Sequence, residues 1–322
     1  MVRRTMIIIA LLLVFVVLWK DFFSFRTIIL SGCDFYDHFD FESKSYNKQC
    51  GLNYWGRRKN FENKDDIRFF PILNSILAPT KGTIVMIEFG ANIGQFSETV
   101  LSTPHNIPFV VYSLEPVTAI FNVLTNRTVM FEKQKGDKHF QYNIAISNHN
   151  GKAPIYSVKD TLTEGASLGK EPKFNFVKVG DVLVTTLPDF INEYHIKTPV
   201  SFIKIDVEGF EPEVIMGMNL KTNKDRFPLF CFETGGTWRD DRSVLAKTFT
   251  LKSFVAMLDG QGYDSFFIGY PYLLPINGEY WDDSFDDFTR ASNILAVLRH
   301  SNPWKSLFMK LRNVSLNSCR WQ

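Results

Sequence analysis

The sequence predicts an α/β protein whose core is a parallel sheet. From residue 83 onward, short apolar runs alternate with longer segments of helical character, as strands alternate with helices in such folds. The runs are apolar throughout, which is typical of parallel strands buried on both faces. Seven runs are present, at 83–89, 109–114, 139–146, 201–205, 228–232, 265–268 and 293–298. Helices are expected between them, among others at 94–102, 117–126, 211–218 and 250–260.

The composition is that of a chain with a sizeable core. Of 322 residues, 45% are hydrophobic and 22% are charged, which excludes a disordered, collagen-like or coiled-coil protein. The 36 basic and 34 acidic residues leave a net charge of +2. A chain so nearly neutral has no bulk attraction for a polyanion, so nucleic acid is not expected as a partner. The sequence leaves the oligomeric state open.

The N-terminal segment predicts a single transmembrane helix that anchors the protein. Arg3 and Arg4 precede an uncharged apolar run at 5–19. As a helix the run would span ~22 Å, which suits the thinner membranes of the early secretory pathway. The basic residues favour a cytoplasmic N-terminus, with the rest of the chain in the lumen or outside the cell. A cleaved signal peptide is the alternative, but no small-x-small cleavage site follows the run closely.

Four parts are predicted along the chain: a signal anchor at 1–25, a stem with a lead-in helix at 26–80, the α/β domain at 81–300 and a tail at 301–322. Cys33 and Cys50 are close enough in sequence for a local disulfide, and Cys319 is the fourth cysteine. Cys231 lies within an apolar run, which predicts a buried thiol. The triplets at Asn126 and Asn313 are glycosylation acceptors if the domain faces the lumen of the endoplasmic reticulum or Golgi.

Polar residues directly after the strands predict the ligand site, because open parallel sheets bind ligands beyond the carboxyl ends of their strands. These residues are Glu88, Gly90, Asn92 and Gly94 after the first run, Glu115 after the second, Ala145 in the third, and Asp206 and Glu208 after the fourth. Glycine lets a ligand approach the backbone, and a carboxylate at 115 can accept both hydroxyls of a ribose. The G-x-G-x-x-G turn of nicotinamide-binding sites is missing, which favours a nucleoside without phosphates, such as S-adenosylmethionine.

In these residues the chain resembles the FkbM-type S-adenosylmethionine-dependent methyltransferases over about 83–298. The resemblance rests on an ordered series of motifs: EFGANIGQFS at 88–97, YSLEP at 112–116, NIAIS at 143–147, GASL at 165–168, TTLPD at 185–189, FIKIDVEGFE at 202–211 and FCFE at 230–233. It implies a Rossmann-like seven-stranded class I methyltransferase sheet with helices on both faces, S-adenosylmethionine as cofactor, and O-methyl transfer to a small molecule or glycan. Two positions depart from the family pattern: Glu88 stands where Asp is frequent, and Pro188 interrupts T-L-D.

Methyl transfer to a hydroxyl needs alignment of the reacting atoms and removal of a proton. Period-two alternation predicts that Asp206 and Glu208 face one pocket, where one acts as base and the other orients the acceptor. Phe210, Trp238 and the aromatic segment 270–281 are expected around the acceptor. No histidine set has the spacing of a metal site, so no metal is predicted, although assistance by a divalent ion stays open.

Two other functions remain possible from the sequence. Asp206-Val207-Glu208 imitates the D-x-D motif with which membrane-anchored glycosyltransferases hold a metal and a nucleotide sugar. Such an enzyme has no need of the adenosine-type features at Gly90 and Glu115. A catalytically inactive lumenal binding module on the same fold is the second alternative, and the presence of every candidate carboxylate argues against it.

Overall fold

The computed structural model describes residues 39–40, 45–46, 73–74, 76–77, 82–131, 133–134, 136–158, 165–170, 176–269, 273–289 and 291–307. The predicted anchor at 1–25 lies outside these residues, as do Cys33, Cys50, Cys319 and Asn313. No helix within the described part of the chain combines the length and the apolar character needed to cross a membrane. The chain divides into two units, 1–52 with 309–322 and 53–308. The first contains a short antiparallel ladder of β1 (Phe39–Asp40) and β2 (Ser45–Tyr46).

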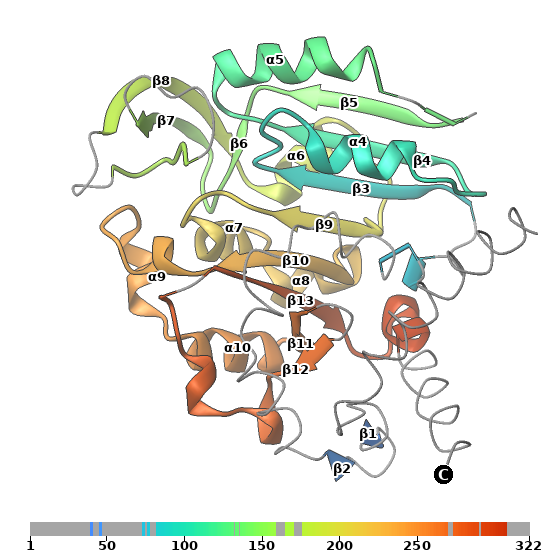
Figure 1. The fold of residues 1–322 in the computed structure, drawn as a ribbon, viewed down its shortest axis with the longest axis vertical. Helices are drawn as coiled ribbons and strands as arrows, with labels where there is room; N and C mark the ends of the chain where they lie inside the picture. The colour runs from blue at the N-terminus through green and yellow to red at the C-terminus, as the bar shows by residue number, and fades with distance from the viewer. Residues whose placement is uncertain are drawn as a thin grey trace, which may run out of the picture. The chain divides into compact units, whose positions relative to one another are not determined.

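An eight-stranded sheet is the centre of the second unit (Figure 1). Its strands, in spatial order, are β12 (Leu273–Pro275), β11 (Tyr263–Ile268), β13 (Ser292–Leu298), β10 (Leu229–Thr234), β9 (Phe202–Ile205), β3 (Ile84–Phe89), β4 (Phe109–Leu114) and β5 (Lys138–Tyr142). The five strands from β10 to β5 are parallel. β13 runs antiparallel between β10 and β11, and β12 is antiparallel to β11. The expectation of seven parallel strands is therefore wrong at this edge, because a strand buried on both faces is apolar whichever way it runs.

The predicted strand at 139–146 is in fact two strands in two sheets. β5 ends at Tyr142, and Asn143 holds the following turn by donating hydrogen bonds from Nδ2 to the carbonyl oxygens of Glu115 and Pro116, both at 2.9 Å. β6 (Ala145–Ile146) then begins a three-stranded sheet of order β6-β8-β7. An apolar run that continues through the turn conceals this break in the sequence.

The pattern of apolar runs does not predict the other two strands of the small sheet, β7 (Gly151–Val158) and β8 (Phe176–Thr185). Only one face of β8 is well buried, so β8 lacks the continuous apolar run of the central strands. The buried face includes Val182 and Val184, which pack with Val117 and Ile120 from the main domain. Figure 1 shows that the small sheet lies on the side toward which the parallel strands point.

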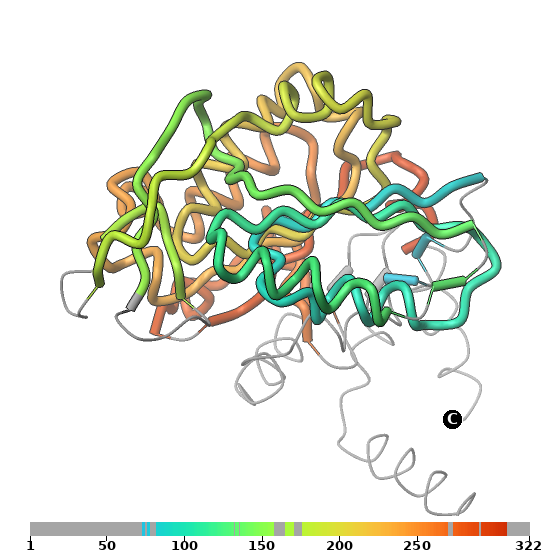
Figure 2. The backbone as a smooth tube through the Cα atoms, turned by 90° about the horizontal axis from the view of Figure 1, so that it is seen from above, coloured from blue at the N-terminus to red at the C-terminus, as the bar shows by residue number. Residues whose placement is uncertain are grey.

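Helices cover both faces of the main sheet, with α4 and α5 on one side and the yellow α6 to α8 on the other (Figure 2). The α-helices are α4 (Gln95–Ser102), α5 (Thr118–Thr128), α6 (Leu187–Glu193), α7 (Glu211–Gly217), α8 (Leu220–Asn223), α9 (Val244–Thr248) and α10 (Leu251–Gly260). Short 3₁₀ helices are η2 (Lys224–Arg226), η3 (Gly236–Trp238), η4 (Gly278–Tyr280) and η5 (Asp283–Phe285). The four predicted helices are confirmed to within two residues.

Pro188, one of the two departures from the family pattern, lies in the first turn of α6. Proline suits that position because its missing N–H would have no partner within the helix anyway. Thr186 caps the same helix by accepting a hydrogen bond from the Asp189 N–H, and the Asp189 carboxylate accepts from the Thr186 hydroxyl at 2.8 Å. The Thr-Thr-Leu-Pro-Asp motif therefore starts a helix.

Apolar side chains fill the space between the sheet and its helices. Cys231 in β10 is buried, as predicted from its apolar surroundings. In the lead-in segment, the described residues 73–74 and 76–77 are helical, and Leu73, Ile76 and Leu77 are buried. Buried charged side chains gather at the carboxyl ends of the parallel strands, and these define the site described next.

Candidate active site

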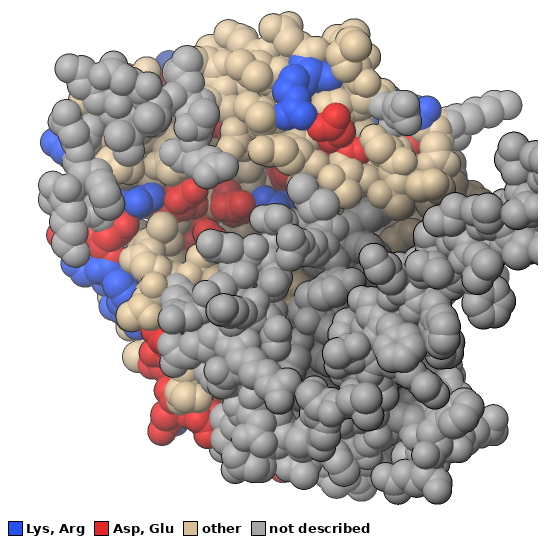
Figure 3. Space-filling model, in the orientation of Figure 1, with Lys and Arg blue, Asp and Glu red and all other residues tan. Residues whose placement is uncertain are grey.

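A cavity of about 630 Å³ lies at the carboxyl ends of the parallel strands. The predicted residues that line it are Glu88, Gly90, Asn92, Glu115, Ala145, Asp206 and Glu208. Phe210 lines it as well, whereas Gly94 does not. In the space-filling view, acidic and basic side chains lie next to one another on this side of the molecule (Figure 3). The fold thus brings strand ends that are far apart in sequence to one cavity, and the individual roles of these residues stay predictions.

The two glycines after β3, Gly90 and Gly94, are required for different structural reasons. Gly94 caps α4 with φ of +88°, and a Cβ there would lie 2.7 Å from Leu124 Cδ1, so it is a packing residue. Gly90 has φ of +71°, and a Cβ there would lie only 1.7 Å from the carbonyl oxygen of Asp206. The expectation that Gly90 mainly makes room for a ligand is thus incomplete, because the chain itself needs this glycine where the loops after β3 and β9 meet.

Glu115 is held by backbone donors at the end of β4. One carboxylate oxygen accepts a hydrogen bond from the Asn92 N–H at 2.9 Å, and the other accepts from the Val117 N–H at 2.8 Å. Burial raises the pKa of Glu115 to about 7, against the lowering effect of these two hydrogen bonds. Each oxygen keeps a lone pair for a ligand, so the geometry is compatible with a ribose diol at this position.

Glu88 lies at the centre of a buried polar network. Its Oε2 accepts hydrogen bonds from the hydroxyls of Ser97 at 3.0 Å and Ser113 at 3.2 Å. The Ser113 hydroxyl also lies 2.8 Å from Nε2 of His139. Burial lowers the pKa of His139 to about 4, so its ring is neutral at pH 7. No role is predicted for His139 from the sequence, and the structure places it behind Glu88.

Small and apolar side chains form one wall of the cavity. They are Ile120 of α5, Ala145 of β6, Ile155 of β7, and Ala166 and Leu168 of the segment that follows β7. This wall gives one side of the cavity an apolar surface.

The Gly-Ala-Ser-Leu motif ties this wall to the loop after β9. Ser167 pairs with Tyr156 of β7 through two backbone hydrogen bonds of 2.9 Å. Its hydroxyl donates to the carbonyl oxygen of Glu208 at 2.9 Å. The motif thus connects the apolar wall of the cavity with the loop that carries Asp206 and Glu208.

Asp206 and Glu208 are each paired with a cation. Lys204 of β9 lies with its Nζ 2.9 Å from Asp206 Oδ2, and Arg242 Nη1 lies 3.4 Å from Glu208 Oε2. The alternation argument that placed both carboxylates on one face is wrong: the strand ends at Ile205, Glu208 has φ of +55°, and Val207 also lines the cavity. A loop, rather than an extended segment, brings the two carboxylates to the cavity.

Glu211, at the start of α7, has a structural role. Its carboxylate accepts hydrogen bonds from the N–H groups of Val207 and Gly209 and from Nε1 of Trp238 at 2.9 Å. Burial raises its pKa to about 8, while the backbone donors lower it. Trp238 is fully buried and stacks on Phe232, so the expectation that it faces an acceptor is wrong.

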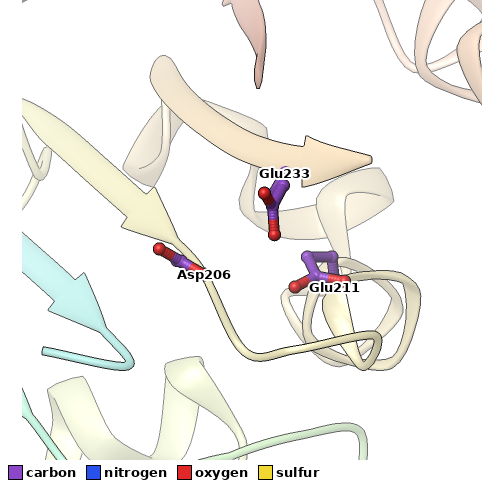
Figure 4. Close-up of side chains that lie close together, drawn as sticks. All are labelled: Asp206, Glu211 and Glu233. Atoms are coloured by element: carbon purple, nitrogen blue, oxygen red, sulfur yellow. The ribbon is translucent and has the colours of Figure 1, made fainter. Parts of the chain in front are cut away.

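Glu233 is the carboxylate that the sequence-based site assignment omits. It belongs to β10, lines the cavity and extends toward Glu211, with Asp206 at the end of β9 (Figure 4). Its position could have been found, because it ends the Phe-Cys-Phe-Glu run just as Glu88 lies near the end of the first run. The strand-end rule that selects Asp206 selects Glu233 equally.

Oxygen atoms of Asp206, Glu211 and Glu233 lie within 4.8 Å of one another, which is a spacing that a divalent cation can bridge. The Lys204 ammonium already contacts Asp206, however, and the oxygens of Glu211 accept N–H donors. Because the protein's own groups already engage two of the three carboxylates, we assign no metal to this cluster.

The fold and the cavity define a class of protein. A Rossmann-like mixed sheet with helices on both faces ends in a cavity with a carboxylate held by backbone donors and an apolar wall, and the G-x-G-x-x-G turn for a pyrophosphate is missing. These are the features of a nucleoside-dependent transferase. The model of the methyltransferase FkbM domain family matches residues 88–264, more than half of the chain. The protein belongs to this family of methyltransferases, whose methyl donor is S-adenosylmethionine.

Comparison with individual proteins adds distant similarities only. No curated protein matches the chain. Among solved structures, methyltransferase FkbM from Methylobacillus flagellatus KT is 15% identical with a TM-score of 0.37, over 68% of this chain and 44% of that one. The N-terminal domain of human METTL16 is 11% identical with a TM-score of 0.38, over 72% and 69% of the two chains. The small RNA methyltransferase HEN1 is 9% identical with a TM-score of 0.41, over 74% and 27%. The chain thus spans less than half the length of the first and last of these proteins.

Proposed function

We propose that this protein transfers the methyl group of S-adenosylmethionine to a hydroxyl oxygen of a small molecule or glycan. The observation that carries the proposal is the order of the strand ends along one cavity. Glu115 follows β4 and Gly90 follows β3, whereas Asp206 follows β9 and Glu233 belongs to β10. In the sheet, β10, β9, β3 and β4 are successive neighbours, and adjacent strands are ~4.8 Å apart. Glu115 and Gly90, which we assign to the nucleoside, therefore lie toward one end of the cavity, and Asp206 and Glu233 lie toward the other.

The nucleoside end would hold the cofactor through this chain's own groups. Glu115 would accept hydrogen bonds from the ribose hydroxyls, the backbone around Gly90 would contact the methionine portion, and the wall containing Ala145 and Ile155 would cover the adenine. When bound, S-adenosylmethionine supplies an electrophilic methyl group on a positively charged sulfonium. Asp206 and Glu208 would orient the acceptor and place its oxygen close to that methyl group.

The charge of the acceptor end supports a neutral acceptor with hydroxyl groups. Asp206, Glu208 and Glu233 line it, and Lys204 and Arg242 pair with the first two of these carboxylates. An anionic acceptor would have to compete with these carboxylates for the two cations, which disfavours its binding. A neutral polyol or sugar instead donates hydrogen bonds from its hydroxyls to the carboxylates.

Calorimetry and a methyl-transfer assay on the full chain test this function against the glycosyltransferase alternative. We expect S-adenosylmethionine to bind 1:1 without added metal, and tritium from the labelled methyl group to appear in a neutral hydroxyl-containing fraction of a cell extract. The variant Glu115→Gln should lower both signals in parallel. Binding of a nucleotide sugar with Mn²⁺, together with no binding of S-adenosylmethionine, would contradict the proposal.

We further propose that residues 1–25 anchor the protein in a membrane of the secretory pathway, with the α/β domain on the lumenal or extracellular side. The support is the basic pair Arg3 and Arg4 before the apolar run. Asn126 is exposed on α5, which makes it accessible to modification. A mobility shift that is lost on treatment with a glycosidase and in the double variant Asn126→Gln and Asn313→Gln supports this orientation, whereas digestion of the domain in intact microsomes would contradict it.

A further inference from the structure

The carboxylates at the acceptor end differ in what holds them. Asp206 pairs with Lys204, Glu208 with Arg242, and Glu211 accepts several N–H donors. For Glu233, by contrast, the structure shows neither a hydrogen bond nor an ion pair of its carboxylate with any residue in the described part of the chain. A carboxylate that already binds a cation is a weak proton acceptor, because the cation stabilises its charged form.

We propose that Glu233 takes the proton of the acceptor hydroxyl, and that it releases its own proton when the positive charge of S-adenosylmethionine enters the cavity. This inference rests on the proposed function and names a proton acceptor for it. The sequence predicts that Asp206 or Glu208 acts as the base. Because each of these carboxylates forms an ion pair, we assign the base to Glu233 instead. Asp206 and Glu208 then keep the task of orienting the acceptor.

The groups that face Glu233 come from three elements. Lys204 belongs to β9, Asp206 and Glu208 to the loop after it, and Glu211 to the start of α7. Burial first, and then the three neighbouring carboxylates, raise the pKa of Glu233 well above its usual range, while Lys204 lowers it. Burial and the neighbouring carboxylates therefore favour the protonated form of Glu233 in the protein without ligand.

Backbone register places Glu233 where an acceptor and the methyl donor would meet. Phe232, the residue before Glu233, pairs with Ile205, the residue before Asp206. Glu233 and Asp206 therefore lie side by side at the ends of the neighbouring strands β10 and β9. On its other side Glu233 pairs with Asn293 of β13, which lines the same cavity. Residues directly opposite in an antiparallel pair point to the same face, so the Asn293 amide is available to hold a second hydroxyl of the acceptor.

The proton balance of the cycle closes without another reactant. Glu233 first loses its proton to solvent, because a nearby positive charge lowers the pKa of a carboxyl group. In the transfer step the acceptor O–H proton passes to Glu233, a C–O bond forms, the C–S bond breaks, and its electron pair stays on sulfur as a neutral thioether. Glu233 is then protonated again, as it was at the start, and the net reaction releases one proton.

Comparing S-adenosylmethionine with S-adenosylhomocysteine tests this coupling without knowledge of the acceptor. The two ligands share the nucleoside, so any proton exchange at Glu115 is common to both, but only the first carries the sulfonium charge. Calorimetry of the full chain at pH 7 in phosphate and in Tris, whose ionisation enthalpies differ, counts the protons released. We expect S-adenosylmethionine to release up to about one proton more than S-adenosylhomocysteine. At pH values below the raised pKa of Glu233, the affinity for S-adenosylmethionine relative to that for S-adenosylhomocysteine should increase as the pH is raised, by up to about tenfold per pH unit.

Variants assign that proton to one residue. Glu233→Gln should abolish the difference between the two ligands. Glu213→Gln is the matched control, because Glu213 is also buried with a raised pKa but binds Ser243 and lies outside the cavity. It should keep the difference. If Glu233→Gln does not fold, equal proton release by the two ligands on the wild-type chain would still overturn the proposal.

Three results would overturn the assignment. The first is equal proton release by the two ligands in the wild-type chain, and the second is an undiminished difference in Glu233→Gln. The third is tight binding of Mn²⁺ alone that is lost in Glu233→Gln, since Glu233 would then be a metal ligand. Failure of S-adenosylmethionine to bind at all is a separate result, which overturns the proposed function itself.

Discussion

The two ends of the cavity hold their carboxylates in different ways. At the nucleoside end, Glu115 accepts hydrogen bonds from two backbone N–H groups and Glu88 accepts from two serine hydroxyls. At the acceptor end, Asp206 and Glu208 pair with cations, and Glu233 is subject to the charges of Lys204 and of the neighbouring carboxylates. Neutral hydrogen-bond donors hold a carboxylate in one position. Charged neighbours instead make the protonation of a carboxylate sensitive to the charge of a ligand that enters the cavity. The difference suggests one end built for binding and another built for proton transfer.

The largest effect is expected on stability, at Gly90, where the loops after β3 and β9 meet. Gly90→Ala should lower the free energy of unfolding by about 3 kcal/mol or more, because it adds a left-handed alanine at ~1–2 kcal/mol to a backbone overlap at ~1–3 kcal/mol. Gly260→Ala is the control: nothing lies within 4 Å of its Cβ position, so the change should stay within about 1 kcal/mol. Urea denaturation measures both. Equal midpoints for the two variants would show that the loops after β3 and β9 do not pack as described.

A smaller effect is expected at the acceptor end. Asp206→Asn and Glu208→Gln should each reduce the turnover of a verified acceptor by about 10²-fold while affinity for S-adenosylmethionine stays within a few-fold, because they remove groups that orient the acceptor. Asp189→Asn, an exposed carboxylate on α6, should leave both quantities unchanged. Initial rates at saturating cofactor give the comparison. A loss of cofactor affinity as large as the loss of turnover would remove the distinction between the two ends.

The smallest expected effect is at the nucleoside end. Glu115→Gln should weaken binding of S-adenosylmethionine by roughly ten- to a hundred-fold, since the loss of a hydrogen bond to a charged group costs about 1.5–3 kcal/mol. S-adenosylhomocysteine should lose the same factor, because the ribose is common to both ligands. Glu98→Gln, which removes a surface carboxylate paired with Arg127, is the control for folding. Unchanged affinity in a folded Glu115→Gln protein would exclude Glu115 from the site.

The strand-end rule explains how much of the site could be predicted. It selects Glu88, Glu115 and Asp206 because parallel strands bring their carboxyl ends to one edge whatever the distance in sequence. Gly94 fails the same test, since a glycine needed for a turn beside Leu124 looks in sequence like a glycine that contacts a ligand. Glu233 obeys the rule as fully as Asp206 does, so the sequence alone could have selected it.

By itself the sequence determined the class of fold, the edge of the sheet that carries the site, and the chemical character of each strand end, because periodicity and strand polarity are local properties of the chain. Only the tertiary structure decided the direction of β13, the division of the third run between two sheets, and the partners of the carboxylates. Arg242 reaches Glu208 and Trp238 donates to Glu211 across stretches of more than twenty residues. Such contacts depend on how distant segments pack, and they determine which carboxylate stays available to take a proton.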